Sequence, residues 1–170
     1  GFIHTVYATY QPLGIKHNFV APIVARDFSV NSYAKLALGV VPGWELVAAG
    51  GEDVRGVKDF GVIERLLAEH LRGLPLWPLA IAFKPRPRTA QVITVEFVDY
   101  PIGLDFANMA PIKVQSVVEG TPAARAGVQR GWRIVRIGEA NVENDRNFQR
   151  VMRLFREAVQ PLRDACVDLT

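Results

Sequence analysis

The sequence predicts an α+β fold, mostly β, in which two similar modules each carry one short and one long helix. The first observation is an internal repeat: Pro-Leu-Gly-Ile at 12–15 returns as Pro-Ile-Gly-Leu at 101–104, and Gly43-Trp44 returns 88 residues later as Gly131-Trp132. The second is a series of short β-branched and aromatic runs separated by Gly and Pro, which is typical of strands and turns. Because unlike residue types recur in the same order about 88 residues apart, we expect two copies of one structural unit.

The composition is that of a folded, globular protein. The 170 residues are 49% hydrophobic and 22% charged, and both halves contain enough large apolar residues for a core. Residues 84–88 read Lys-Pro-Arg-Pro-Arg, which favours an extended, semi-rigid spacer because proline cannot donate to a β-ladder. We therefore expect a first module at 1–84, a linker at 85–89 and a second module at 90–170.

Each copy is predicted to begin with a strand, at 5–10 and at 92–98, where β-branched and aromatic residues show the alternation of half-buried strands. Further strands are predicted at 15–20, 22–25, 44–47 and 76–83 in the first copy, and at 104–109, 112–118, 132–137 and 162–169 in the second. Hairpin turns are expected at Gly50-Gly51 and at 138–141. The strands therefore follow the same order in both copies.

Two helices are expected in each copy. The short ones span 34–38 and 122–126, and each is followed by a glycine that can take the left-handed conformation that closes a helix. The long ones span 59–71 and 146–159, where apolar residues recur at helical spacing on one face. Each copy thus has one long amphipathic helix to cover its strands.

The sequence lacks the motifs of catalysis, cofactor binding and metal binding. His4, His17 and His70 are scattered, Cys166 is the only cysteine, and nucleophile elbow, zinc helix, phosphate loop and dinucleotide fingerprint are absent. No apolar run approaches the roughly 20 residues of a membrane-spanning helix. The net charge of +3 is too small to indicate nucleic acid without a motif. We therefore expect no enzyme activity, catalytic residue, metal, cofactor, nucleic-acid partner or transmembrane segment.

Three stretches of the second copy carry a family resemblance. Residues 100–106 read Tyr-Pro-Ile-Gly-Leu-Asp-Phe, residues 117–128 read Val-Val-Glu-Gly-Thr-Pro-Ala-Ala-Arg-Ala-Gly-Val, and residues 131–138 read Gly-Trp-Arg-Ile-Val-Arg-Ile-Gly. They resemble the Gly-Leu-Gly-Phe loop, the short helix and the following strand of PDZ domains. The first copy resembles the family through its alignment with the second. The chain is therefore similar to a tandem PDZ protein.

The resemblance implies small, partly open β-barrels or sandwiches that bind the C-terminal tails of other proteins by adding them as a strand. It maps the carboxylate-binding loops onto Leu13, Gly14 and Ile15 and onto Ile102, Gly103 and Leu104. It maps the helical groove walls onto Asp59, Ile63 and Leu66 and onto Asn147, Val151 and Leu154. These twelve residues are the candidate peptide sites.

A basic stripe follows the second long helix. Its members are Arg146, Arg150, Arg153 and Arg156. Such a stripe is typical of a solvated helix face or of a surface that docks an acidic protein. Nucleic-acid binding would need further basic clusters with interleaved aromatic residues.

The leading interpretation is a non-enzymatic interaction or scaffold protein that binds partner peptides or C-terminal tails. One alternative is a structural accessory subunit of a large complex, photosynthetic or respiratory, that uses the modules as fixed interfaces. Another is the regulatory PDZ segment of a serine protease. The protein is expected to be soluble and intracellular. Since the first residue is Gly1 rather than Met, an organelle matrix or stroma, reached after loss of a targeting segment, is also considered.

Overall fold

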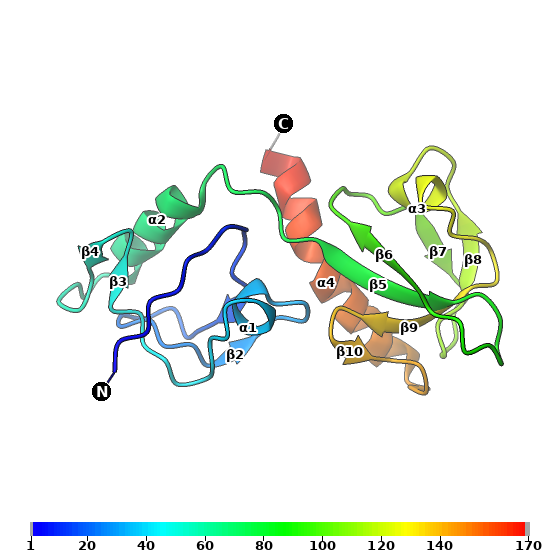
Figure 1. Cartoon of the computed structure of the whole chain (residues 1–170), viewed down its shortest axis with the longest axis horizontal. Helices are drawn as coiled ribbons and strands as arrows, with labels where there is room; N and C mark the ends of the chain where they lie inside the picture. Colours follow the sequence, from blue (N-terminus) through cyan, green and yellow to red (C-terminus); the bar gives the residue numbers. More distant parts are fainter. Residues whose placement is uncertain (1, 169–170) are drawn as a thin grey trace. The chain divides into compact units, whose positions relative to one another are not determined.

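The computed structural model describes residues 2–168 and confirms the α+β class (Figure 1). The described residues form four helices and ten strands, and the strands pair in small antiparallel sheets, none of them closed into a barrel. The chain divides into two compact units, Gly1–Trp77 and Pro78–Thr170. We call these unit 1 and unit 2.

Unit 1 is built from very short strands. Its elements are β1 (Ile15–Lys16), β2 (Asp27–Phe28), α1 (Tyr33–Leu36), β3 (Ala48–Ala49), β4 (Glu52–Asp53) and α2 (Phe60–Leu71). β1 pairs with β2 and β3 with β4, which forms two hairpin-like sheets of two strands each. Ile23, Val54 and Ile63 form the buried centre, so α2 is held to the unit by its apolar face.

Unit 2 has the larger sheet. Its strands are β5 (Leu79–Lys84), β6 (Ile93–Phe97), β7 (Leu104–Phe106), β8 (Val114–Val117), β9 (Arg133–Ile137) and β10 (Ala140–Asn141), and its helices are α3 (Pro122–Arg125) and α4 (Phe148–Asp168). One sheet has the order β10-β9-β5-β6, and β7 and β8 form the other. β5 therefore lies between β9 and β6, and β9 lies between β10 and β5.

The boundary between the units differs from the predicted one. The strand expected to end the first module is β5, and it pairs with β6 and β9, both in unit 2. The side chains of Leu79, Ile81 and Phe83 are fully buried there. The predicted linker at 85–89 is the connection of the β5–β6 hairpin, because β5 and β6 run antiparallel and the proline-rich stretch joins them. The boundary between the units in the sequence therefore lies after Trp77, not at residues 84–85.

Four other predicted strands do not form. Those predicted at 22–25 and 44–47 are reduced to a single isolated bridge between Val24 and Glu45. Residues 5–10 belong to no strand, although their counterpart in the second copy is β6 as expected. The strand predicted at 162–169 is helical through residue 168, and residue 169 lies outside the described residues. The reason is that Val151, Ala158 and Leu162 are all buried at helical spacing, so α4 continues on the same face.

The duplicated sequence is also duplicated in backbone hydrogen bonds. The Trp44 carbonyl accepts from the Ala25 amide at 2.9 Å, and the Trp132 carbonyl accepts from the Val114 amide at 2.7 Å. In the same way, the amide of the preceding glycine donates to Ala25 in one unit and to Val114 in the other, at 2.7 and 2.9 Å. The repeat predicted from residue identities is therefore a repeat of structure.

The spacing of the repeat changes at the short helix. Before it, equivalent residues lie 89 positions apart, as Ala25 and Val114 do, whereas after it they lie 88 apart, as the tryptophans do. The bond that closes the short helix shows why: the Val40 amide donates to Ala34, six residues back, but the Val128 amide donates to Ala123, five residues back. The first copy has one more residue at this turn.

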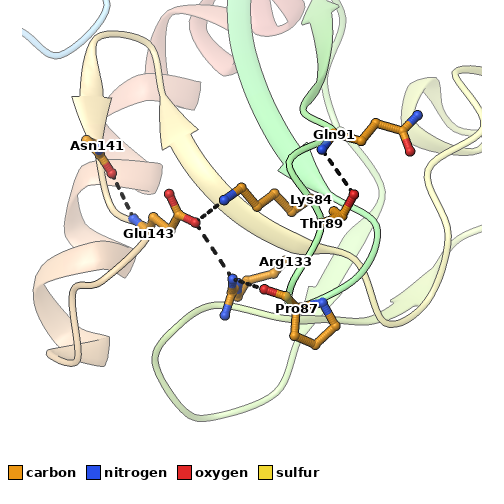
Figure 2. A network of polar contacts seen from close by, with 7 residues as sticks. All are labelled: Lys84, Pro87, Thr89, Gln91, Arg133, Asn141 and Glu143. Carbon is orange, nitrogen blue, oxygen red and sulfur yellow. Dashed lines mark hydrogen bonds and ion pairs between the residues drawn. The ribbon is translucent and has the colours of Figure 1, made fainter.

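A polar network joins the β5–β6 hairpin to β9 (Figure 2). Lys84 and Arg133 both point toward the carboxylate of Glu143, with an Arg133 Nη2 to Glu143 Oε1 distance of 3.8 Å, and Arg133 also donates to the carbonyl of Pro87 at 3.2 Å. The hydrogen bond from Lys84 holds the pKa of Glu143 below its ordinary value, and desolvation opposes this shift only in part. The network thus ties three separate segments of unit 2 together.

We predict that Glu143→Gln lowers the melting temperature of unit 2 at neutral pH. Since the folded pKa of Glu143 is depressed, its stabilising contribution is present above the ordinary value of 4.5 and is lost as the pH falls through the lowered pKa. Thermal unfolding near pH 7 and near pH 3 should show that the difference from the unmodified protein narrows in acid.

Glu119→Gln is the matched control, because it removes the same charge from an exposed turn. It should leave the melting temperature almost unchanged at both pH values. Equal effects of the two substitutions would show that the network does not stabilise unit 2.

Candidate functional site

Unit 2 contains a cavity of about 450 Å³ between a loop, a strand and a helix. The loop is residues 100–103, the strand is β7, and the helix is α4. The lining residues are Tyr100, Pro101, Ile102, Gly103, Leu104, Asp105, Val118, Thr121, Met152, Phe155, Arg156, Val159, Gln160 and Arg163. We call this cavity the groove.

The loop at the end of the groove is held in place by hydrogen bonds that its backbone carbonyl groups accept. The Ile102 carbonyl accepts from the Ala123 amide at 3.0 Å, and the Gly103 carbonyl accepts from the Val118 amide at 2.9 Å. Gly103 has φ +92°, and a Cβ there would lie 2.0 Å from the Thr121 hydroxyl oxygen. Only glycine fits this position, because both the backbone angle and the neighbouring side chain exclude any other residue.

One edge of β7 faces the groove. The only strand that pairs with β7 among the described residues is β8, and the Gly103 carbonyl and the Ala107 amide both bond toward the β8 side. Since backbone groups alternate along a strand, the amides and carbonyls of Leu104 and Phe106 face the opposite edge. An extended peptide laid in the groove would meet these groups.

The helical wall is apolar along its length and basic at its rim. Met152, Phe155 and Val159 line the groove at helical spacing, and the Phe155 ring contacts the Phe106 ring of β7 edge-on at 5.1 Å. The hydrophobic contact fixes the distance between strand and helix at one end. The opening toward the loop is therefore held between two rigid elements.

The charged groups at the groove are two arginines and one aspartate. Arg156 and Arg163 are exposed, and neither has an ion-pair or hydrogen-bond partner within the described part of the chain. Asp105 accepts a hydrogen bond from the Ser116 hydroxyl of β8 at 2.8 Å, so its carboxylate is directed along the β7–β8 sheet. The two arginines give the helical rim a positive charge that is available to an anionic group.

The structure brings together part of the predicted site of the second copy. Ile102, Gly103 and Leu104 line the groove, and Arg156 of the basic stripe lines it as well. The predicted wall residues lie elsewhere. Asn147 accepts from the Arg150 amide at 3.1 Å, just before α4, Val151 is 1% exposed in the core, and Leu154 is half-buried outside the lining.

The other arginines of the stripe do not reach the groove. Arg150 forms an ion pair with Asp145 at 3.4 Å, and Arg146 and Arg153 are exposed away from the lining. On α4, the groove residues that sequence analysis missed are Met152, Phe155, Val159, Gln160 and Arg163. The three apolar ones have a sequence signal, the Met-x-x-Phe-x-x-x-Val spacing, which marks a second apolar stripe beside the one that enters the core.

The loop of unit 1 repeats that of unit 2. The Leu13 carbonyl accepts from the Ala34 amide at 2.9 Å, and the Gly14 carbonyl accepts from the Ser29 amide at 3.0 Å. Gly14 has φ +74°, and Ile15 begins β1. The predicted loop residues of the first copy therefore have the backbone arrangement found in the second.

The strand and helix of unit 1 are joined by aromatic contacts. His17, which follows β1, lies 5.0 Å from both Phe19 and Phe60 between ring centroids, and the two phenylalanine rings are 5.8 Å apart. Of the predicted wall residues, Asp59 caps α2 by accepting from the Gly61 amide at 2.9 Å, and Ile63 is 1% exposed in the core. Leu66 packs half-buried against that core. These predicted wall residues hold α2 in place.

No family model matches the chain, and neither a curated protein nor a solved structure matches it. No helix among residues 2–168 is long and apolar enough to cross a membrane. Within the same residues, no group of three or more His, Cys, Asp or Glu side chains could hold a metal ion.

We predict that Gly103→Ala destabilises unit 2 more than Gly131→Ala. Both glycines have φ +92°, so each alanine incurs about 1–2 kcal/mol of backbone strain. Only at position 103 does the new Cβ also overlap Thr121, which adds roughly 1–3 kcal/mol. Urea unfolding of the two variants measures the difference directly.

The Gly131 variant is the control, since nothing lies within 4 Å of its new Cβ. Equal losses for both variants would mean that the loop moves away from Thr121 and is not held against α3.

Proposed function

We propose that unit 2 is a non-enzymatic binding module that takes an extended peptide from another protein as a strand beside β7, with the peptide's free C-terminal carboxylate at the loop. The observation that carries the proposal is the groove itself: an edge of β7 that no strand among residues 2–168 pairs with opens onto an apolar wall of α4. Strand addition of this kind gains main-chain hydrogen bonds from the edge and specificity from the side-chain pocket.

The pocket favours an apolar residue at the end of the peptide. Ile102 and Leu104 lie on the loop and strand side, and Met152 and Phe155 lie on the helix side. Burial of one Val or Leu side chain between them contributes about 1.5–3 kcal/mol. This term supplies a large share of the affinity of a short peptide, because the backbone of the peptide must be ordered on binding.

The carboxylate would be held by the loop and by the arginines of α4. The positive φ of Gly103 turns the backbone between two strand-like segments, which supports an approach of the ligand to the loop amides. Arg156 and Arg163 lie on the same wall and have no competing partner within residues 2–168. Hydrogen bonds from guanidinium groups to a carboxylate are stronger than neutral ones.

The resemblance to PDZ domains supports the proposal, because it implies a peptide site made of a loop, an edge strand and a helix in the second copy. The proposal assigns this role to unit 2 alone. In unit 1, His17, Phe19 and Phe60 join the corresponding strand and helix, and this contact occupies the side chains that a ligand would have to meet. We therefore propose one peptide site in the chain rather than two.

We predict that six-residue peptides ending in Val, Leu, Ile or Phe bind the full chain as free acids and bind at least about tenfold more weakly as C-terminal amides. Isothermal titration calorimetry at low and at moderate salt measures both forms. The preference for the acid should decrease with salt, since screening weakens the attraction to exposed arginines.

The double substitution Arg156→Gln and Arg163→Gln should reduce the affinity for the free acid by roughly tenfold, because each partly exposed ion pair contributes about 0.2–1 kcal/mol. Arg153→Gln is the control, because it removes the same charge from the same helix outside the groove. Equal binding of acid and amide, or equal effects of the groove and control substitutions, would contradict the proposal.

A further inference from the structure

The middle residue of β7 faces away from the groove wall formed by α4. In β7, Leu104 and Phe106 are half-buried, whereas Asp105 between them is exposed. The Phe106 ring contacts Phe155 of α4, so the side chains at 104 and 106 lie on the face toward the helix. Asp105 therefore lies on the opposite face of the strand, at the rim of the groove that it also lines.

The carboxylate of Asp105 is held in place by its neighbour on β8. Asp105 lies directly opposite Ser116 in the antiparallel pair, and the Ser116 hydroxyl donates to its Oδ2 at 2.8 Å. This bond uses only part of the capacity of a carboxylate, whose two oxygens can accept about four hydrogen bonds. Among the described residues of unit 2, no cationic side chain forms an ion pair with Asp105. Its charge is therefore fixed in position but is not neutralised within unit 2.

Unit 1 carries a different pair of residues at the same place. The spacing of 89 residues that holds before the short helix maps Asp105 onto Lys16 and Ser116 onto Asp27. Lys16 lies directly opposite Asp27 in the pair of β1 and β2. In unit 1 a cation therefore faces an acid across the two strands, whereas in unit 2 the acid faces a hydroxyl.

The direction of the proposed peptide fixes which of its residues meets Asp105. Because its carboxylate is placed at the loop that precedes β7, the peptide runs antiparallel to β7. Its terminal side chain enters the apolar pocket and so lies opposite Leu104. The penultimate residue then lies opposite Asp105, and its side chain points to the same outer face. Side chains directly opposite each other have Cβ atoms about 4.5–5.5 Å apart, which is within the reach of a charge pair.

We propose that the groove of unit 2 selects C-terminal tails whose penultimate residue is Lys or Arg. The inference rests on the proposed strand addition and adds the class of partner, a tail that ends in a basic residue followed by an apolar one. Opposite charges on directly facing residues attract, and like charges are unfavourable by a similar amount. Arg156 and Arg163 belong to the helical wall rather than to β7, so they act on the terminal carboxylate. Asp105 is the residue that determines the specificity.

Two peptides of identical composition test the inference, acetyl-Glu-Ala-Ser-Ala-Lys-Val and acetyl-Lys-Ala-Ser-Ala-Glu-Val, both with a free carboxylate. They differ only in which charge is penultimate, so an effect of net charge is excluded. Calorimetry with the full 170-residue chain should show about three- to tenfold tighter binding of the peptide with penultimate lysine. A third peptide, with glutamine at both charged positions, should bind with intermediate affinity, and it reports whether the site is intact in each variant.

Two substitutions of Asp105 locate the preference. Asp105→Asn should make the two charged peptides bind about equally, because asparagine keeps an acceptor for Ser116 but has no charge. Asp105→Lys should reverse their order, and lysine is the residue at the equivalent position of unit 1. Asp99→Asn is the control, because it removes the same charge from an exposed position outside the groove lining, and it should leave the preference unchanged.

The outcomes separate this inference from the proposed function. Carboxylate-dependent binding of the glutamine peptide, with no preference between the charged ones, would overturn the inference and leave the proposed function standing. A preference for penultimate glutamate, or a preference for lysine that survives Asp105→Asn, would overturn the inference as well. Failure of all three peptides to bind, or equal binding of the acids and their amides, would instead overturn the proposed function and the inference with it.

Discussion

The pairing of β5 on both of its edges is the interaction on which the rest of unit 2 depends. It joins β6 to β9, two strands that are far apart in the sequence, and it buries Leu79, Ile81 and Phe83 between them and the rest of the core. β6 leads directly into the loop at 100–103, and β9 leads through β10 to α4. The two walls of the groove are therefore attached to the two neighbours of one strand. A strand hydrogen-bonded on both sides fixes their spacing more firmly than loops could.

The two copies share a backbone frame and differ in what their surfaces offer. The hydrogen bonds of the glycine turn and of the tryptophan carbonyl recur in both, so the frame does not depend on most side chains. At the site, by contrast, a few substitutions change the chemistry. Phe106 and Phe155 leave a cavity toward the loop in unit 2, whereas His17, Phe19 and Phe60 form a continuous contact in unit 1. Divergence at these positions accounts for the difference between the groove of unit 2 and the aromatic contact of unit 1.

Much of this architecture could be predicted from the sequence, because its signals are local. The glycines after the short helices, the Pro-x-Gly turns and the apolar faces of the long helices each fix the backbone within a few residues, and the elements formed there. The loop residues Ile102, Gly103 and Leu104 are predicted through the resemblance to PDZ domains, and they line the groove. The sequence could not predict which strands pair with the strand at 79–84. An apolar run carries no signal that distinguishes between two similar sheets.

The errors at the groove and at the C-terminal end have a related cause. α4 carries two apolar stripes, one with Val151 that enters the core and one with Met152 that lines the groove, and a helical period alone cannot say which stripe faces a ligand. The C-terminal run at 162–168 was interpreted as a strand because the first copy was expected to end in one. In the structure, β5 occupies the position between β6 and β9 in the sheet of unit 2. Residues 162–168 are therefore not needed as a strand there, and they continue α4.

The covalent connection between the units has a mechanical consequence. A single residue, Pro78, separates Trp77, the last residue of unit 1, from Leu79, the first residue of β5. Tension applied through the N-terminal half would thus load the middle strand of the other half along its own axis. Two rows of hydrogen bonds would then have to shear at once rather than open one after another, so unit 2 is arranged to resist pulling from that direction.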